Sequence, residues 1–206
     1  NFTGANFGDG IACIGDVNGD GYSDVCIGAK LAGVTGAAAV FHGGTTGTAT
    51  AFTMSKFGGV TNARLGASAG NVGDINGDGY TDAIFGAPGL NSAYVHYGSA
   101  AGLTVAPSLT LTGGAGTQFG ASVASAGDVN GDGYADVIIG APLSGTGAAY
   151  IHMGGPGGLA AAAALTLTGG SLFGTSVAPA GHVNTDGYAD VIVGAPGSGQ
   201  AFVFHG

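Results

Sequence analysis

The chain contains the stretch Asp16-Val-Asn18-Gly-Asp20-Gly21-Tyr22-Ser-Asp24, and it repeats this pattern three more times. The other copies begin at Asp74, Asp128 and His182, so successive copies are 58, 54 and 54 residues apart. The first three copies place oxygen-bearing side chains at positions 1, 3, 5 and 9, with a glycine at position 6 where the backbone must turn. This spacing allows one short segment to surround a hard cation such as Ca²⁺. The repeat therefore predicts calcium loops.

The chain's carboxylates are concentrated in these loops. Of the 12 acidic residues, all of which are aspartates, only Asp9 lies outside them. We expect the side chains at positions 1, 3, 5 and 9 and the backbone carbonyl of the tyrosine at position 7 to bind the metal. The expected metal ligands are Asp16, Asn18, Asp20, Tyr22, Asp24, Asp74, Asn76, Asp78, Tyr80, Asp82, Asp128, Asn130, Asp132, Tyr134, Asp136, Asn184, Asp186, Tyr188 and Asp190. No catalytic or organic-cofactor residues are expected.

Two other interpretations of the loop compete with the metal site. An EF-hand needs a bidentate glutamate at position 12, where this chain has only apolar residues, so that interpretation fails. A turn rich in Asp and Asn without any metal is disfavoured, because three carboxylates converge with no cation to balance them. The fourth loop begins with His182 and has Thr185 where the others have glycine. Because Ca²⁺ prefers oxygen ligands, we expect three strong Ca²⁺ sites and a fourth that is weak or empty.

The segments between the loops have the character of β-strands. Each unit contains short apolar runs rich in β-branched and aromatic residues, separated by Gly, Pro, Asn or Ser, and none has a helical period. A repeat of about 54 residues with four antiparallel strands predicts an all-β fold, a β-propeller of four-stranded blades. We expect one domain over 1–206, with repeats at about 7–64, 65–118, 119–172 and 173–206, the last completed by 1–6.

The order of the motifs identifies a family. Phe-Gly, then Asp-Val-Asn-Gly-Asp-Gly-Tyr-x-Asp, then Gly-Ala-Pro resembles the FG-GAP repeat of the propeller of integrin alpha subunits and of integrin-like fungal lectins. The resemblance covers essentially the whole chain. It implies a propeller in which the calcium loops join the first and second strands of each blade. Propellers of this family serve in adhesion, in sugar binding and as appendages of secreted enzymes.

The number of blades leaves three architectures open. Family members mostly have seven blades, whereas this chain has four repeats. It could form a closed four-bladed ring as a monomer, part of a larger propeller, or half of an eight-bladed ring made by two chains. In the closed ring, Asn1-Phe-Thr-Gly4 would act as a latch and supply the fourth strand of the last blade. The residues before each glycine of the Phe-Gly motif, Phe7, Leu65, Phe119 and Phe173, are expected to form wedges between blades.

The composition limits the binding partners and the cellular location that are expected. The formal net charge is −9, and only three basic residues are present, so neither nucleic-acid binding nor attraction to an anionic membrane is expected. No apolar run reaches the roughly 18 residues of a membrane-spanning helix, and no membrane insertion is expected. Calcium loops point to a secreted or cell-surface location. Cys13 and Cys26 flank the first loop, which favours a disulfide over two buried free thiols.

These observations favour a non-catalytic, calcium-stabilised recognition module that binds a glycan or an extracellular protein, as a lectin or an adhesion domain does. The alternative is a structural accessory propeller of a secreted hydrolase, with no ligand of its own. Glycoside hydrolysis needs two free carboxyl groups, and Asp9 is the only carboxylate outside the loops, so the chain is not expected to be an enzyme. The tyrosines at position 7 could stack on sugars, but packing on the neighbouring blade is the favoured interpretation.

Overall fold

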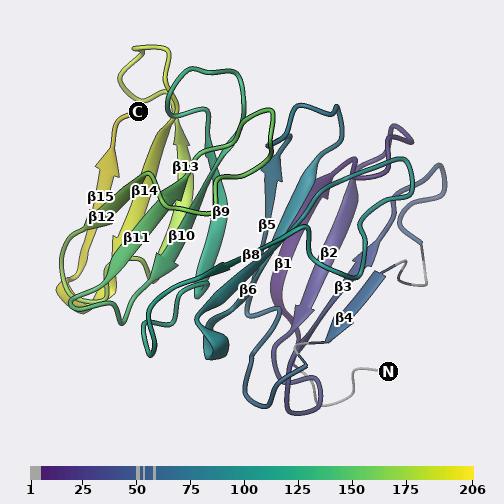
Figure 1. The fold of residues 1–206 in the computed structure, drawn as a ribbon, viewed down its shortest axis with the longest axis horizontal. Helices are drawn as coiled ribbons and strands as arrows, with labels where there is room; N and C mark the ends of the chain where they lie inside the picture. The colour runs from purple at the N-terminus through teal and green to yellow at the C-terminus, as the bar shows by residue number, and fades with distance from the viewer. Residues whose placement is uncertain (1–5, 50–51, 53, 58) are drawn as a thin grey trace.

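The computed structural model describes residues 6–49, 52, 54–57 and 59–206. The described chain is all-β, as expected, and forms four antiparallel sheets in which strands are ordered as in the sequence (Figure 1). The first sheet contains β1 (Phe7–Gly15), β2 (Asp24–Ala29), β3 (Ala37–Phe41) and β4 (Met54–Phe57). The second contains β5 (Ser68–Gly73), β6 (Asp82–Ala87), β7 (Ser92–His96) and β8 (Leu109–Thr112).

The other two sheets repeat this arrangement. The third contains β9 (Ser122–Gly127), β10 (Asp136–Ala141), β11 (Ala148–His152) and β12 (Leu165–Thr168). The fourth contains β13 (Ser176–Gly181), β14 (Asp190–Ala195) and β15 (Gln200–Phe204), and it has three strands among the described residues. Short 3₁₀ turns, η1 (Pro88–Leu90) and η2 (Pro196–Ser198), join the second and third strands of the second and fourth sheets. We call the sheets blades 1 to 4.

The blades pack face to face through three apolar clusters. Leu65, Phe119 and Phe173 each lie in one cluster, buried between their own blade and the preceding one. The second strands β6 and β10 are buried along their whole length because neighbouring blades cover both of their faces. The wedge prediction is therefore confirmed at these three positions. Phe7, the fourth expected wedge, is 43% exposed, and it lies in none of the three clusters.

Pairs of glycines bring the backbones of neighbouring blades together. Each pair consists of a glycine in the second strand of one blade and the glycine that follows the wedge residue of the next blade. The pairs are Gly28 with Gly66, Gly86 with Gly120, and Gly140 with Gly174. A methyl group on Gly140 would overlap the backbone carbonyl of Gly174. Because the methyl group would be fixed to β10 and the atom that it meets belongs to the backbone of the next unit, neither can move aside without shifting a blade.

The substitution Gly140→Ala should therefore lower the free energy of unfolding by about 1–3 kcal/mol, the range typical of overpacking. Gly157→Ala is the matched control, because nothing lies within 4 Å of the added methyl group. Chemical denaturation of both variants measures the difference. Equal stability of the two variants would contradict the proposed backbone contact.

The structure does not show the closed four-bladed ring. The inner strands make contact in the order β1–β5, β5–β9 and β9–β13, and within the described residues no comparable contact joins β13 to β1. Figure 1 shows blades 1 and 4 at opposite ends of an open row. Four blades close a ring only if the last blade packs on the first, and the four sheets here form a row instead. The proposed latch, Asn1 to Gly4, lies outside the described residues.

The expected disulfide is also absent. Cys13 and Cys26 are both free, and Cys13 is exposed whereas Cys26 is buried. The register pairs Cys13 with Val25 and Ala12 with Cys26. Because side chains alternate between the faces of a sheet, the two thiols lie on opposite faces of blade 1. Burial raises the pKa of the Cys26 thiol to about 12, so this cysteine is an unreactive core residue.

Candidate functional site

All four loops connect the first and second strands of a blade, in agreement with the family pattern. Each loop is anchored by the aspartate at position 9, the first residue of the second strand, which is fully buried in every blade. In the second loop, Asp82 Oδ2 accepts the N–H of Ile75 at 2.9 Å and Oδ1 accepts the N–H of Gly98 at 2.8 Å. The position 9 carboxylate therefore joins the base of the loop to the segment after the third strand.

The aspartate at position 1 organises the turn itself. Asp74 Oδ1 accepts the N–H groups of Gly77 at 2.7 Å and Asp78 at 3.1 Å, and Oδ2 accepts the N–H of Gly79 at 2.8 Å. Asp16 and Asp128 make the same three bonds in their loops. In the first loop, burial raises the pKa of Asp16, but these N–H groups lower it and hold the net pKa below the ordinary value.

Positions 3 and 5 are joined to each other. Asn76 Nδ2 donates to Asp78 Oδ2 at 2.9 Å, and Asn76 Oδ1 accepts the N–H of Asp78 at 3.0 Å. The first and third loops repeat both bonds. The amide of position 3 therefore crosslinks the loop, and its oxygen keeps a second lone pair beside the one that accepts the position 5 N–H.

The carboxylates of one loop are close enough to repel each other. The pKa of the Asp82 carboxyl is raised to about 6, first by burial and then by the negative charges of Asp78 and Asp74, against the lowering effect of the N–H groups of Gly98 and Ile75. Burial and the charges of Asp132 and Asp128 raise the pKa of Asp136 in the same way. This repulsion is the electrostatic property that a bound cation would remove.

The donor chemistry of the first three loops fits Ca²⁺, because every expected side-chain ligand offers oxygen. In the described part of the chain, however, no three acidic, histidine or cysteine side chains are gathered into a metal-holding group. In the second loop, the oxygens of positions 1, 3 and 5 accept backbone N–H groups of their own loop. The ligand assignment remains a prediction.

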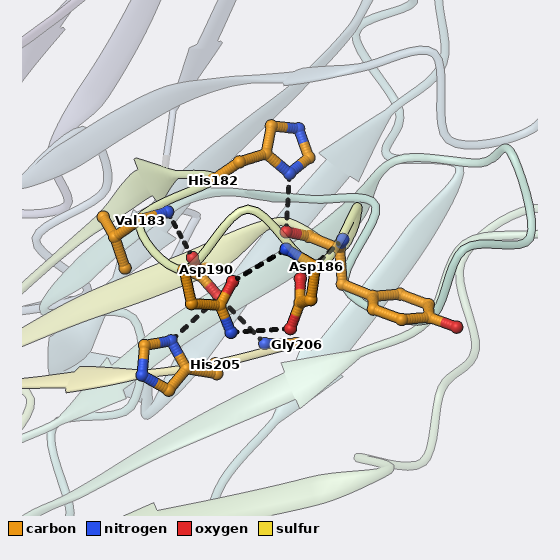
Figure 2. Close-up of polar contacts among 8 residues, drawn as sticks. His182, Val183, Asp186, Asp190, His205 and Gly206 are labelled. Carbon is orange, nitrogen blue, oxygen red and sulfur yellow. Dashed lines mark hydrogen bonds and ion pairs between the residues drawn. The ribbon is translucent and has the colours of Figure 1, made fainter.

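The fourth loop is built differently (Figure 2). His182 Nδ1 lies 2.6 Å from the carbonyl oxygen of Tyr188, which is the expected position 7 ligand. Asp190 accepts the N–H groups of Val183 and Gly206 and faces His205 Nδ1 at 3.3 Å. Burial raises the pKa of Asp190, but these N–H groups and His205 outweigh it, so the net pKa is lowered. The imidazole thus ties position 1 directly to position 7, and this loop does not fit Ca²⁺ as it stands.

The position 7 tyrosines connect successive loops. A methyl group on Gly19 would lie 2.7 Å from Cε1 of Tyr80, and Gly77 and Gly131 have the same relation to Tyr134 and Tyr188. Each of these rings therefore lies over the glycine of the preceding loop, as the packing interpretation expected. Tyr22 and Tyr188 are both exposed, at 41% and 42%, so this contact leaves part of the ring of Tyr188 open to solvent. The contacts show that the loops form one continuous face of the protein.

A polar groove that the sequence analysis missed lies at the opposite end of the blades. It has a volume of about 480 Å³ and spans blades 1 to 3. Its lining includes the side chains of Asn62, Arg64, Asn91 and Gln118, all of which have positive φ. Non-glycine residues with positive φ are uncommon and often mark sites of function or strain. The sequence contains one signal for this groove, since Arg64 and Gln118 both directly precede a wedge residue.

Comparison with known proteins agrees with the motif order. The FG-GAP repeat matches residues 119–152 and 173–204, and an FG-GAP-like repeat matches residues 16–85. Integrin alpha-PS5 of Drosophila melanogaster is 29% identical over 148 residues, which is 64% of this chain and 15% of that protein. Integrin alpha-3 of Cricetulus griseus is 35% identical over 144 residues, or 62% of this chain and 14% of that protein. Human integrin alpha-7 is 42% identical over 98 residues, 43% of this chain and 8% of that protein.

The chain thus spans about 15% or less of the length of these curated relatives. Among the described residues, no helix is long and apolar enough to cross a membrane. The matched segments contain all four loops and together cover more than half of the chain. This chain belongs to the FG-GAP repeat family and is similar to integrin alpha subunits.

Proposed function

We propose that this chain is a non-catalytic, calcium-stabilised recognition module of the cell surface or the extracellular space. Similarity to integrin alpha subunits supports an adhesion or recognition role outside the cell. The observation that carries the proposal is the repeated loop, in which the first three copies place Asp, Asn and Asp at positions 1, 3 and 5 and a buried Asp at position 9. The only acidic residue outside the loops, Asp9, pairs with Lys30 at 3.0 Å, which leaves no pair of free carboxyl groups for glycoside hydrolysis.

The polar groove provides a candidate surface for the ligand. Guanidinium and amide side chains donate and accept hydrogen bonds in fixed directions, which suits the hydroxyl groups of a glycan. Arg64, Asn62 and Gln118 present such groups in a concave site between rigid blades. We therefore favour a glycan over an extracellular protein as the ligand. The alternative function remains that of an accessory propeller in a secreted hydrolase.

A glycan array probed in calcium and in a chelator tests the recognition proposal. We expect binding in calcium, and we expect Arg64→Ala to weaken it by about tenfold, which corresponds to the loss of one charged hydrogen bond. Gln200→Ala is the control, because this amide lies in blade 4, away from the groove. If neither glycans nor a panel of extracellular proteins binds in calcium, the accessory function replaces the proposal.

The fourth loop offers a direct test of the metal assignment. His182→Asp removes the hydrogen bond to the Tyr188 carbonyl and supplies the missing carboxylate. We expect this variant to bind one more Ca²⁺ per chain than the parent protein in a calorimetric titration. His182→Ala separates the two effects, since it frees the carbonyl without adding a carboxylate, and it should not gain the site. No gain of Ca²⁺ affinity in His182→Asp would contradict the explanation.

A further inference from the structure

The polar groove is built on hydrogen bonds between backbone groups. The N–H of Gly89 donates to the carbonyl of Ala63 at 3.1 Å, and the N–H of Leu143 donates to the carbonyl of Thr117 at 3.1 Å. Each bond joins the turn after the second strand of a blade to the segment that leads into the first strand of the same blade. These backbone groups are paired within the protein, so the lining side chains determine which ligand the groove accepts.

The side chains that line the groove are rich in hydrogen-bond donors. Asn91 Oδ1 accepts the N–H of Gln118 at 2.9 Å, which leaves the Nδ2 group of Asn91 as a donor. The guanidinium group of Arg64 offers only N–H donors, and Asn62 and Gln118 each add an amide. An ionised carboxylate only accepts hydrogen bonds, so a ligand that carries such a group complements this set of donors.

The positive charge of Arg64 has no partner in the groove. Among the described residues that line it, none is acidic. Of the 12 aspartates, only Asp9 lies outside the loops at the other end of the blades, and it pairs with Lys30 at 3.0 Å. Within the part of the chain that the structure describes, Arg64 is exposed and forms no ion pair. An anionic ligand would supply the missing partner.

The negative charge of the loops is too far away to exclude an anion. Strand β6 runs from the second loop to η1, whose residues Pro88 and Gly89 line the groove. Its six residues, at about 3.3 Å each, separate the two ends by about 20 Å. This distance exceeds the Debye length, which is about 8 Å at physiological ionic strength. Arg64 therefore dominates the potential that a ligand meets in the groove.

The backbone does not require an arginine at this position. The residue before each wedge has a φ between 50° and 58° in all four units, and these residues are Asn6, Arg64, Gln118 and Leu172. The same backbone conformation thus accepts an amide, a charged group or an apolar side chain. The positive φ belongs to the repeat, whereas the charge is particular to the unit that borders the groove.

We propose that the groove selects an acidic glycan, with the anionic group of one sugar residue bound by Arg64. This inference rests on the proposed glycan-binding function and specifies its ligand class. A guanidinium group can donate parallel N–H bonds to both oxygens of a carboxylate, and a sulfate group offers acceptors of the same kind. The amides of Asn62, Asn91 and Gln118 would bind the hydroxyl groups of the sugar. Leu143, which is 47% exposed, offers an apolar contact for its C–H groups.

A glycan array in calcium that pairs each acidic glycan with its neutral counterpart tests this selectivity. Uronic-acid oligosaccharides are paired with their carboxyl-reduced forms, and sulfated oligosaccharides with their desulfated forms. We expect the chain to bind the acidic member of a pair about tenfold more tightly, as one charge-assisted hydrogen bond provides. Selectivity among the uronic-acid pairs identifies a carboxylate as the bound group, and selectivity among the sulfated pairs identifies a sulfate.

Two results of the array overturn the inference in different ways. Equal binding of acidic and neutral members overturns it and leaves the recognition proposal in place. Absence of binding to every glycan also overturns it, and the panel of extracellular proteins then decides whether the recognition proposal fails as well.

The substitution Arg64→Gln tests whether the arginine supplies the selectivity. Gln118 occupies the same position in the next unit with a φ of 55°, so the backbone accepts this residue. The variant should bind the acidic glycan about tenfold more weakly and its neutral counterpart as before. Lys30→Gln is the control, because it removes the same charge from a residue that does not line the groove. Melting curves like that of the parent chain show that both variants are folded.

The two variants together separate the groove from the overall charge of the chain. Selectivity that is lost in Arg64→Gln and kept in Lys30→Gln supports the inference. Selectivity that survives in Arg64→Gln overturns it, and so does an equal loss in both variants, since net charge would then account for the preference.

Discussion

Phe173→Ala is expected to lower the free energy of unfolding by about 3–5 kcal/mol, the range for removal of a buried aromatic side chain. Phe173 is fully buried between blades 3 and 4. Its ring packs against those of Phe202 and Phe204, with centroids 5.5 Å and 5.9 Å away. Truncation would therefore leave a cavity between sheets that cannot collapse without moving a blade.

Phe7→Ala is the matched control, because Phe7 has the same place in the repeat but is 43% exposed. The decrease in the free energy of unfolding should be much smaller for Phe7→Ala than for Phe173→Ala when both are measured by denaturant unfolding. Equal losses for the two variants would mean that the wedge position, and not its burial between blades, determines the effect.

Removal of calcium should produce the second large effect. If each of the first three loops binds Ca²⁺ with a dissociation constant tenfold below the ambient concentration, linkage stabilises the fold by about 1.4 kcal/mol per loop, or about 4 kcal/mol in total. The physical source is the repulsion within each loop, where the charges of Asp74 and Asp78 act on buried Asp82. Melting curves with and without a chelator should therefore differ by roughly 10 °C.

Two variants make the calcium measurement specific. Asp78→Ala removes one expected ligand and should reduce the difference between the curves by about one third, whereas Asp9→Asn lies outside the loops and should leave the difference unchanged. An identical transition with and without chelator would contradict calcium stabilisation. Loss of the difference in Asp9→Asn would show that the chelator acts elsewhere.

Local features of the fold were predictable from the sequence because they depend on short segments. The run Leu165-Thr-Leu-Thr168 forms a strand, and the two glycines that follow it mark its end. The wedge role of Phe119 and Phe173 follows from their constant distance to the loops. The polar groove was not predictable in this way, because it is formed by residues from three blades whose backbone has positive φ.

The cysteines and His182 show features that a short segment of sequence does not predict. Cys13 and Cys26 are close in the chain, but a one-residue difference in register places them on opposite faces of a sheet. His182 could be recognised as a poor calcium ligand, yet its hydrogen bond to the Tyr188 carbonyl depends on how the loop closes. Register and loop closure both depend on contacts made across the blade.

The sequence by itself determined the repeat, the strands, the loop donors and the membership of the FG-GAP family. These properties are encoded within each unit, so the pattern that predicts them occurs four times in the chain. Only the tertiary structure decided that the four blades form an open row with apolar faces at both ends. Ring closure depends on the angle between packed blades, which is summed over all the junctions and set by side chains from different units, so no single repeat encodes it.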